Sequence, residues 1–333
     1  MKKIDIHTHI LPEKLPDWAS KFGYGGFIQL NHHAPCKARM MKDGKLFREI
    51  ASNCWDPKQR VLECDEVGVN IQVLSTVPVM FSYWANAKDA YDVSRYLNDH
   101  IAEVVRLFPD RFIGLGTVPL QDPELACMEV QRCMNDLGLA GVEIGSHVND
   151  WNLDEAALFP FYQTAEEESA AIFVHPWEML GAERMPRYWL PWLVGMPAET
   201  SLAICSMIFG GVLEKFKKLR VAFAHGGGSF AASYARIRHG FEMRPDLVAV
   251  RNDIHPDQYL GKFWVDSLVL DAEILQKLIQ LFGVEKVAMG SDYPFPLGEH
   301  PPGNLFEKNK VFTTEIKEWL NYKSAESWLG MSL

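Results

Sequence analysis

The stretch Ile4-Asp5-Ile6-His7-Thr8-His9-Ile10 combines a short apolar run with two histidines that are one residue apart. Side chains of an extended strand alternate between its two faces, so we expect His7 and His9 to point the same way. Two neutral imidazoles at the tip of one strand can bind a single divalent metal ion. Taken alone, the pattern favours a polar strand end with solvated histidines, so a metal site requires further ligands elsewhere in the chain.

The composition is ordinary for a globular protein with a large core. The chain has 333 residues, of which 48% are hydrophobic and 23% charged, so it can form one large barrel or two smaller domains. A formal net charge of −10 argues against general affinity for nucleic acid or an anionic membrane, and we expect neither partner. The six cysteines form no CxxC pair and no signal-peptide pattern begins the chain. We therefore expect free thiols and a cytoplasmic location.

Eight short apolar runs recur along the chain, separated by segments long enough for helices. Several runs are apolar almost throughout, which is typical of parallel strands covered on both faces. The expected strands are Lys3–Ile10, Ile71–Val77, Phe112–Val118, Gly141–Ser146, Ala171–His175, Arg220–His225, Phe263–Leu268 and Lys286–Ser291. The pattern predicts an α/β fold, a (β/α)8 TIM barrel that forms one domain over residues 1–333. A doubly wound sheet is the competing fold, but its usual Gly-rich phosphate turn is missing.

Two regions exceed what a minimal barrel needs. Residues 12–60 separate the first strand from the first helix pattern and contain four glycines and a strand-like run at 27–31. We expect a small inserted flap over the barrel mouth there. Residues 300–333 begin with His300-Pro301-Pro302-Gly303 and continue with helical patterns. We expect C-terminal helices that pack outside the barrel.

Polar side chains end several of the apolar runs, namely His175, His225 and Asp292. Barrel enzymes build their sites at the carboxyl ends of the strands, so we expect these three side chains to meet His7 and His9 there. Each one has a structural explanation of its own, such as a helix cap for Asp292. A single shared site explains all five positions together. Three imidazoles and a carboxylate also leave a ligand position for water, which a catalytic metal site needs.

The nature of the metal follows from these ligands. A nitrogen-rich set with one carboxylate suits Zn²⁺, while Fe²⁺, Co²⁺ and Mn²⁺ are alternatives. We expect one ion per subunit, because a second ion needs a bridging ligand such as a modified lysine. The run 139–147, which contains the fourth strand, has no lysine.

The strand-end residues match the pattern of the amidohydrolase superfamily, and the chain resembles the zinc-dependent decarboxylases within it. The resemblance extends from the first strand to about residue 300. Its most specific segments are Trp189-Leu190-Pro191-Trp192-Leu193-Val194, Met196-Pro197-Ala198-Glu199-Thr200 and Gly290-Ser291-Asp292-Tyr293-Pro294-Phe295-Pro296-Leu297-Gly298-Glu299. A generic hydrolase on the same scaffold does not need these segments.

The resemblance implies a role for each strand-end residue. It assigns His7, His9, His175 and Asp292 as zinc ligands. It assigns His225 as a catalytic histidine beside the metal, within reach to accept a proton from water. A fifth ligand is the alternative role for His225.

The resemblance further implies a small anionic substrate with two carboxylates, an amine and an aldehyde. Arginines bind carboxylates in bidentate geometry, and Arg48 and Arg236 match the substrate arginines of the family. In that family the second arginine reaches the neighbouring subunit's site, so we expect a homodimer in which Arg236 is donated to its partner. Trp192 and Phe295 are expected to line the pocket, with core packing as the alternative.

The activity implied by the resemblance is a non-oxidative decarboxylation in tryptophan breakdown, with no organic cofactor. A related decarboxylase acting on an aromatic acid is the nearest alternative. A metal-dependent hydrolase would use the same ligands, and a non-catalytic barrel would leave them idle.

Overall fold

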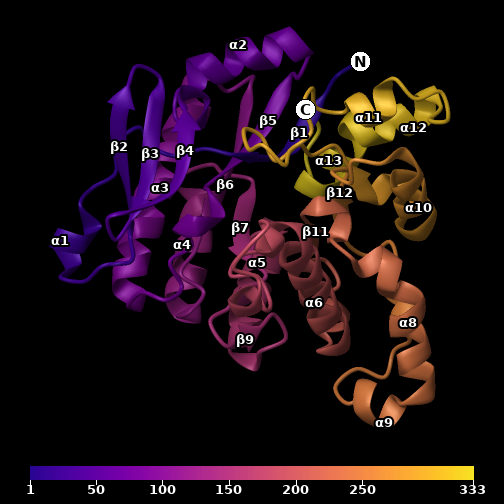
Figure 1. Ribbon diagram of the computed structural model, residues 1–333. Helices are drawn as coiled ribbons and strands as arrows, with labels where there is room; N and C mark the ends of the chain where they lie inside the picture. Colours follow the sequence, from indigo (N-terminus) through magenta and orange to yellow (C-terminus); the bar gives the residue numbers. More distant parts are fainter.

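The computed structural model describes residues 1–333 and contains a parallel sheet of eight strands that curls into a barrel (Figure 1). In sheet order the strands are β1 (Ile4–His9), β5 (Ile71–Ser75), β6 (Phe112–Thr117), β7 (Gly141–Gly145), β10 (Ala171–His175), β11 (Arg220–Phe223), β12 (Trp264–Asp266) and β13 (Val287–Ala288). All eight predicted strands are present, although most are shorter than predicted. The TIM-barrel prediction is confirmed.

The last strand meets the first through individual hydrogen bonds rather than a full ladder. The backbone N–H of Ile6 donates to the carbonyl of Met289 at 2.9 Å, and that of His9 donates to the carbonyl of Tyr293 at 2.8 Å. The barrel is therefore closed by Met289 and by Tyr293, the residue that directly follows Asp292.

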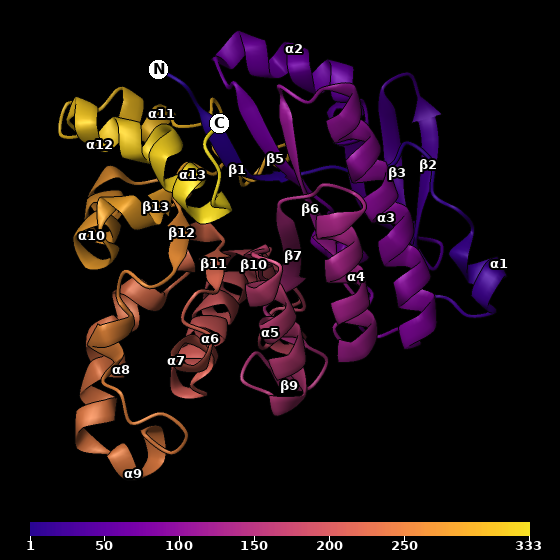
Figure 2. The same ribbon diagram turned by 180° about the vertical axis from the view of Figure 1, so that it is seen from behind.

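Helices cover the outside of the barrel, as the alternating pattern predicts. They are α2 (Pro57–Val67), α3 (Ala87–Leu107), α4 (Pro123–Asn135), α5 (Phe159–Glu167), α6 (Met196–Phe209), α7 (Val212–Lys215), α8 (Phe230–Met243), α9 (Pro245–Val248) and α10 (Ala272–Phe282). Figure 2 shows α3, α4 and α5 side by side over the sheet. Helix α10 illustrates the sequence logic, because Asp271 caps its N-terminus and Leu275, Leu278 and Phe282 bury one face.

A small antiparallel sheet stands beside the barrel in the region where the sequence predicts a flap (Figure 1). It consists of β2 (Ile28–Ala34), β3 (Lys37–Lys42) and β4 (Lys45–Ala51), and helix α1 (Trp18–Phe22) precedes it. Its buried side chains Ile28, Ala38, Met40 and Ile50 pack with Val77 and Val79 of the loop after β5. The flap sheet is thereby fixed against the carboxyl end of the barrel. A second, two-stranded sheet, β8 (His147–Val148) and β9 (Trp151–Asn152), follows β7.

The C-terminal helices are α11 (Asn304–Glu307), α12 (Thr314–Glu318) and α13 (Ser324–Leu329). Helix α13 packs against one end of the barrel. Its Trp328 is fully buried, and the ring lies 5.8 Å from that of Phe173 on β10. Both rings belong to the cluster that contains Ile4 and Ile6 of β1. Helix α13 therefore fills the end of the barrel opposite the strand-end histidines.

One helical stretch, Pro191–Phe209, is long and apolar enough to cross a membrane by length and composition alone. Half of its apolar window is buried, and Met207 and Ile208 are fully enclosed in the main hydrophobic core. Core packing accounts for the apolar residues of its second half.

Candidate active site

Five side chains from separate parts of the chain meet at the carboxyl end of the barrel. His7 and His9 lie on β1, and His175 is the last residue of β10. His225 and Asp292 do not end strands as predicted, because β11 stops at Phe223 and β13 at Ala288. Both stand in loops with left-handed backbone, at φ 55° and φ 58°. Such strained positions in non-glycine residues concentrate at functional sites.

The nitrogen and oxygen atoms of this group lie at the separations expected for ligands of one metal ion. Nε2 of His7 is 3.2 Å from Nε2 of His9, and Nε2 of His9 is 3.1 Å from Oδ1 of Asp292. The ring of His175 lies 5.1 Å from the rings of both His7 and His9. Bonds of about 2.0–2.1 Å in a tetrahedral site separate ligand atoms by about 3.3 Å. The residues present therefore fit a metal ion of this size.

Hydrogen bonds on the far side of each ring aim three imidazoles at the same point. Nδ1 of His7 bonds Oδ2 of Asp266 at 2.7 Å, Nδ1 of His9 bonds the carbonyl of Thr76 at 2.9 Å, and Nδ1 of His175 bonds the carbonyl of Pro176 at 2.9 Å. These acceptors keep the proton on Nδ1, so each Nε2 presents a lone pair. Nε2 of His175 is buried and has no protein partner. A buried nitrogen without a partner is the strongest sign that a ligand belongs there.

The electrostatics of the group suit metal binding. Burial and the neighbouring histidines hold the pKa of His175 well below its usual value, and burial also lowers the pKa of His9, which favours the neutral ligand form. Burial alone would raise the pKa of Asp292, but the neighbouring imidazoles of His225, His9 and His7 outweigh it and leave the pKa well below its ordinary value. Asp292 therefore stays ionised and supplies a negative charge to a cation.

His225 differs from the other histidines. Nδ1 of His225 is buried without a hydrogen-bond partner, and its Nε2 lies 3.8 Å from Oδ2 of Asp292. Its ligand atom, with those of His7, His175 and Asp292, belongs to a set whose members all lie within 4.8 Å of one another. The geometry thus brings His225 into the group that could hold a metal ion but fixes neither of its ring nitrogens.

Two buried carboxylates beside the ligands are absent from the sequence-based set. Asp266, at the end of β12, bonds His7 and also accepts the backbone N–H groups of His225 at 2.9 Å and Gly226 at 2.7 Å. Glu143, within β7, has its Oε1 3.6 Å from Nδ1 of His9. Burial raises the pKa of Glu143 well above its ordinary value. A charged residue inside an otherwise apolar strand is the sequence signal that would have identified both.

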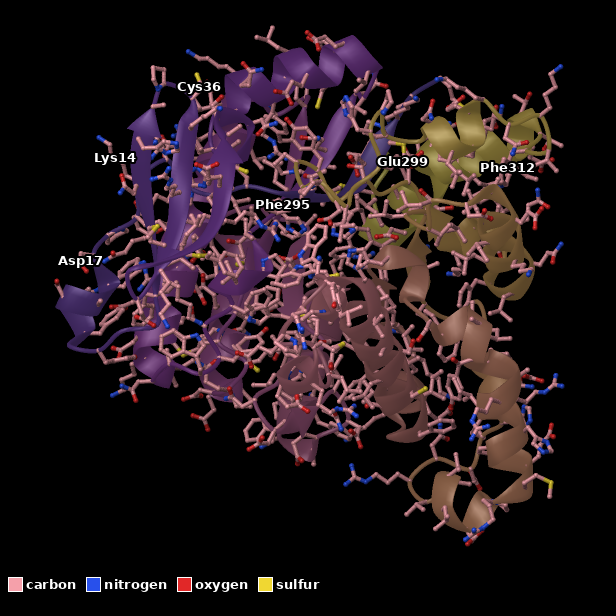
Figure 3. All side chains as sticks on the ribbon, viewed as in Figure 1. Lys14, Asp17, Cys36, Phe295, Glu299 and Phe312 are labelled. Atoms are coloured by element: carbon pink, nitrogen blue, oxygen red, sulfur yellow. The ribbon has the colours of Figure 1, made fainter.

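A cavity of about 320 Å³ opens beside the five residues. Arg48 and Phe295 both line it, and the guanidinium carbon of Arg48 lies 4.4 Å from the centre of the Phe295 ring. That ring in turn lies 5.6 Å from the ring of His9, so Arg48 is held next to the histidine group. Figure 3 shows Phe295 near the centre of the molecule, between the flap sheet and the barrel.

The remaining lining is mostly apolar and aromatic. Its aromatic members are Phe47, Trp177, Trp189, Trp192 and Phe295, so the prediction that Trp192 faces the pocket agrees with its position. Arg48 is the one cationic side chain among the lining residues. Arg236 does not line the cavity, because it is exposed on α8. Within one chain, a single arginine is therefore available to an anionic substrate.

Comparison with known proteins agrees with this geometry. The sequence matches the amidohydrolase family over residues 4–331. It is 59% identical to 2-amino-3-carboxymuconate-6-semialdehyde decarboxylase of Dictyostelium discoideum, over 99% of this chain and 92% of that protein. It is 39% identical to the enzyme of the same name from Caenorhabditis elegans, over 99% of this chain and 94% of that protein.

A solved structure with the same fold is 5-carboxyvanillate decarboxylase of Novosphingobium aromaticivorans, complexed with manganese, at a TM-score of 0.81 and 19% identity over 99% of this chain and 96% of that one. The similarity to the first relative and the match to the family both extend over nearly the whole sequence, including every site residue described above. The chain therefore belongs to the amidohydrolase family, within it to the family of the two decarboxylases above, and it is a carboxy-lyase.

Proposed function

We propose that this carboxy-lyase converts 2-amino-3-carboxymuconate 6-semialdehyde into 2-aminomuconate 6-semialdehyde, as a cytoplasmic enzyme of tryptophan catabolism by the kynurenine route. The observation that carries the proposal is the convergence of three Nε2 atoms and Asp292 beside a pocket whose one cation is Arg48. The 59% identity to a relative of that name supports the choice of substrate.

The metal proposed for this site is one Zn²⁺ per subunit, held by His7, His9, His175 and Asp292. Imidazole nitrogens with one carboxylate oxygen are a donor set that zinc prefers, and the atom separations above fit its bond lengths. When bound, such an ion supplies Lewis-acid chemistry, which includes lowering the pKa of water towards about 7.

Arg48 is proposed to bind one substrate carboxylate. Its planar guanidinium offers bidentate hydrogen bonds, and stacking on Phe295 holds it in place next to the histidine group. The protein carries a net charge of −10, so a dicarboxylate needs local positive charge to enter.

The second carboxylate is proposed to bind Arg236 of the neighbouring subunit in a homodimer. Arg236 is exposed on α8, which together with α9 projects from the body of the chain in Figure 1. An arm of this kind can reach a partner's pocket without disturbing its own barrel. The homodimer would then supply the second cation that the pocket of one chain lacks.

His225 is proposed to deliver the proton that replaces the leaving carboxylate on the substrate carbon. When the C–C bond to the leaving carboxylate breaks, CO₂ departs and a proton must replace it on the carbon. The other three histidines have Nδ1 fixed by hydrogen bonds, whereas neither nitrogen of His225 is fixed in this way. A ring with a free tautomer can take up and return a proton within the pocket.

The test uses purified protein loaded with zinc and enzymatically generated 2-amino-3-carboxymuconate 6-semialdehyde. We expect the substrate absorbance to fall, one CO₂ to be released per substrate, and a chelator to stop the reaction. In D₂O the carbon that lost CO₂ should carry one deuterium. A Lys310→Ala variant, changed at an exposed lysine between α11 and α12, serves as the control and should keep full activity.

Other outcomes would contradict parts of the proposal. Turnover of 5-carboxyvanillate or γ-resorcylate, without turnover of the semialdehyde, would favour an aromatic-acid decarboxylase. Cleavage of the substrate by water into two fragments, without CO₂, would indicate a hydrolytic reaction. CO₂ release undiminished by metal removal would contradict the metal site.

A further inference from the structure

Arg60 on α2 is a fully buried guanidinium outside the set of residues discussed so far. It forms no ion pair; its Nε and Nη1 donate to neutral acceptors, and its Nη2 is buried without a hydrogen-bond partner. Burying an arginine without a carboxylate partner is unfavourable, and an apolar side chain of similar size would fill the space at lower cost. The position of this charge therefore calls for a role beyond packing.

The acceptors of Arg60 belong to separate parts of the active site. Its Nη1 donates to the carbonyl of His9 at 2.6 Å and to the carbonyl of Asn53 at 3.0 Å. Its Nε donates to the side chain of Gln72 on β5 at 3.2 Å. One guanidinium thus holds the backbone of a proposed metal ligand and the backbone that leaves the flap sheet.

The hydrogen bond to Asn53 connects Arg60 to the strand that carries the proposed substrate arginine, Arg48. Asn53 lies in the short turn after β4, the strand that carries Arg48. In addition, the N–H of Leu11, two residues after His9, donates to the carbonyl of Cys54 at 2.8 Å. The end of β4 and the end of β1 are therefore joined at two adjacent points, and Arg60 makes one of them.

A second residue of α2 completes the connection. Arg60 stacks on the ring of Tyr293, with its guanidinium carbon 4.7 Å from the ring centre. The hydroxyl of Tyr293 donates to Glu63 at 2.5 Å, and Glu63 also accepts from the side chain of Asn53 at 3.1 Å. Because Glu63 follows Arg60 by three residues, both face the same side of the helix. Tyr293 directly follows Asp292, so Arg60 and Glu63 together also hold the backbone next to this second proposed metal ligand.

We propose that Arg60 is a positioning residue that fixes the metal ligands His9 and Asp292 relative to the substrate arginine Arg48. With Glu63, it forms the one place where the first strand, the loop after the last strand and the flap sheet are bonded to a single helix. The inference rests on the proposed metal site and on Arg48, but not on the identity of the substrate.

The test compares Arg60→Met, Arg60→Lys and Lys58→Met as full-length proteins stripped of metal. Lys58 is an exposed cation on the same helix, so its replacement controls for lost charge. Two quantities are measured, Co²⁺ affinity by visible absorption and hydrogen exchange of the backbone in residues 45–56. Neither measurement requires substrate.

For Arg60→Met we expect Co²⁺ to bind about 10- to 100-fold more weakly, with an altered visible spectrum. Exchange in residues 45–56 should accelerate while exchange in β6 and β7 stays unchanged, which a general loss of stability would not produce. Arg60→Lys retains the charge but loses the planar guanidinium with its several N–H donors. Its Co²⁺ affinity and its exchange rates in residues 45–56 should lie between those of Arg60→Met and the wild type. Lys58→Met should match the wild type.

Wild-type Co²⁺ affinity and local exchange in a folded Arg60→Met protein would overturn the proposal. If Arg60→Met does not fold, the same two wild-type values in Arg60→Lys would overturn it. Absence of Co²⁺ binding to the wild type would instead refute the metal site, and this inference with it. Loss of activity towards one substrate class only would bear on the proposed function and not on Arg60.

Discussion

The carboxylate of Asp266 lies 2.7 Å from Nδ1 of His7, and the same oxygen accepts the backbone N–H of His225 at 2.9 Å. Asp266 therefore orients a proposed ligand and the proposed proton carrier at once. Hydrogen bonds from His7 and Gly226 overcome the effect of burial and lower its pKa, so it is ionised. An ionised partner also makes the imidazole of His7 a stronger metal ligand.

Replacing Asp266 with Asn should weaken metal binding or activity by about 10- to 100-fold, because the charge behind His7 is lost while the shape is kept. Metal affinity by competition with a chelator, and turnover at saturating metal, measure the two effects. Asp253→Asn, at an exposed aspartate, is the control. Unchanged affinity and turnover in Asp266→Asn would show that its hydrogen bonds serve the fold alone.

Replacing His175 with Ala should abolish metal retention and turnover, because it removes the one buried Nε2 that has no protein partner. Metal content per chain after dialysis gives the answer directly. A variant that keeps one ion per chain would place the metal elsewhere.

Replacing His225 with Asn should leave the metal content at the wild-type level and reduce turnover by about 10²- to 10⁴-fold, as expected for loss of a general acid–base group. Metal analysis and turnover are measured on the same preparation. Loss of metal together with activity would make His225 a fifth ligand instead.

Mixing inactive Arg236→Ala and His175→Ala proteins should restore activity, if Arg236 acts across a dimer. Random exchange makes half of the dimers mixed, and each mixed dimer has one intact site, so about a quarter of wild-type activity should return. A mixture of Arg48→Ala with His175→Ala is the control. It should stay inactive, because Arg48 lines the pocket of its own chain. No recovery in the first mixture, with exchange demonstrated, would contradict the shared site.

The pair His147–Glu199 predicts a pH dependence of stability. Nδ1 of His147 lies 3.3 Å from Glu199, whose other oxygen accepts the N–H of Leu180 at 2.9 Å, so the pair anchors the segment that leads to Trp192. The hydrogen bond to Glu199 raises the pKa of His147 despite partial burial. Its stabilising effect is thus complete below the unfolded value of about 6.5 and is lost as pH rises through the higher folded value.

Against a His147→Gln variant, the wild type should have its largest advantage in melting temperature at the acidic end of the range, near pH 5.5, and lose that advantage as pH rises. Thermal unfolding from pH 5.5 to 9 measures the difference. A difference that stays constant with pH would show that His147 is neutral in the folded protein.

The barrel and the five converging residues were predictable because each produces a recognisable pattern over a few consecutive residues. A strand in a covered parallel sheet is a short apolar run, and a histidine or aspartate after such a run stands out. The positions of His225 and Asp292 beyond their strands were not predictable, because left-handed loop geometry leaves no periodic pattern.

Arg60 and Trp328 could not be assigned from sequence for a related reason. An arginine on a helix is usually exposed, and nothing in its neighbourhood marks Arg60 as buried beneath β1. Likewise, the aromatic side chain of α13 enters the barrel only because the strands leave that end open. Long-range packing decides both positions, and short-range patterns do not encode it.

The ring of strands is joined where residues near Ile6 and His9 meet residues near Met289 and Tyr293, and Trp328 fills its lower end. A ribosome delivers the first strand long before these partners exist. The proposed metal site can therefore form only after Asp292 has been synthesised and has joined His7 and His9. A chain interrupted before Asp292 would lack one of the four proposed ligands.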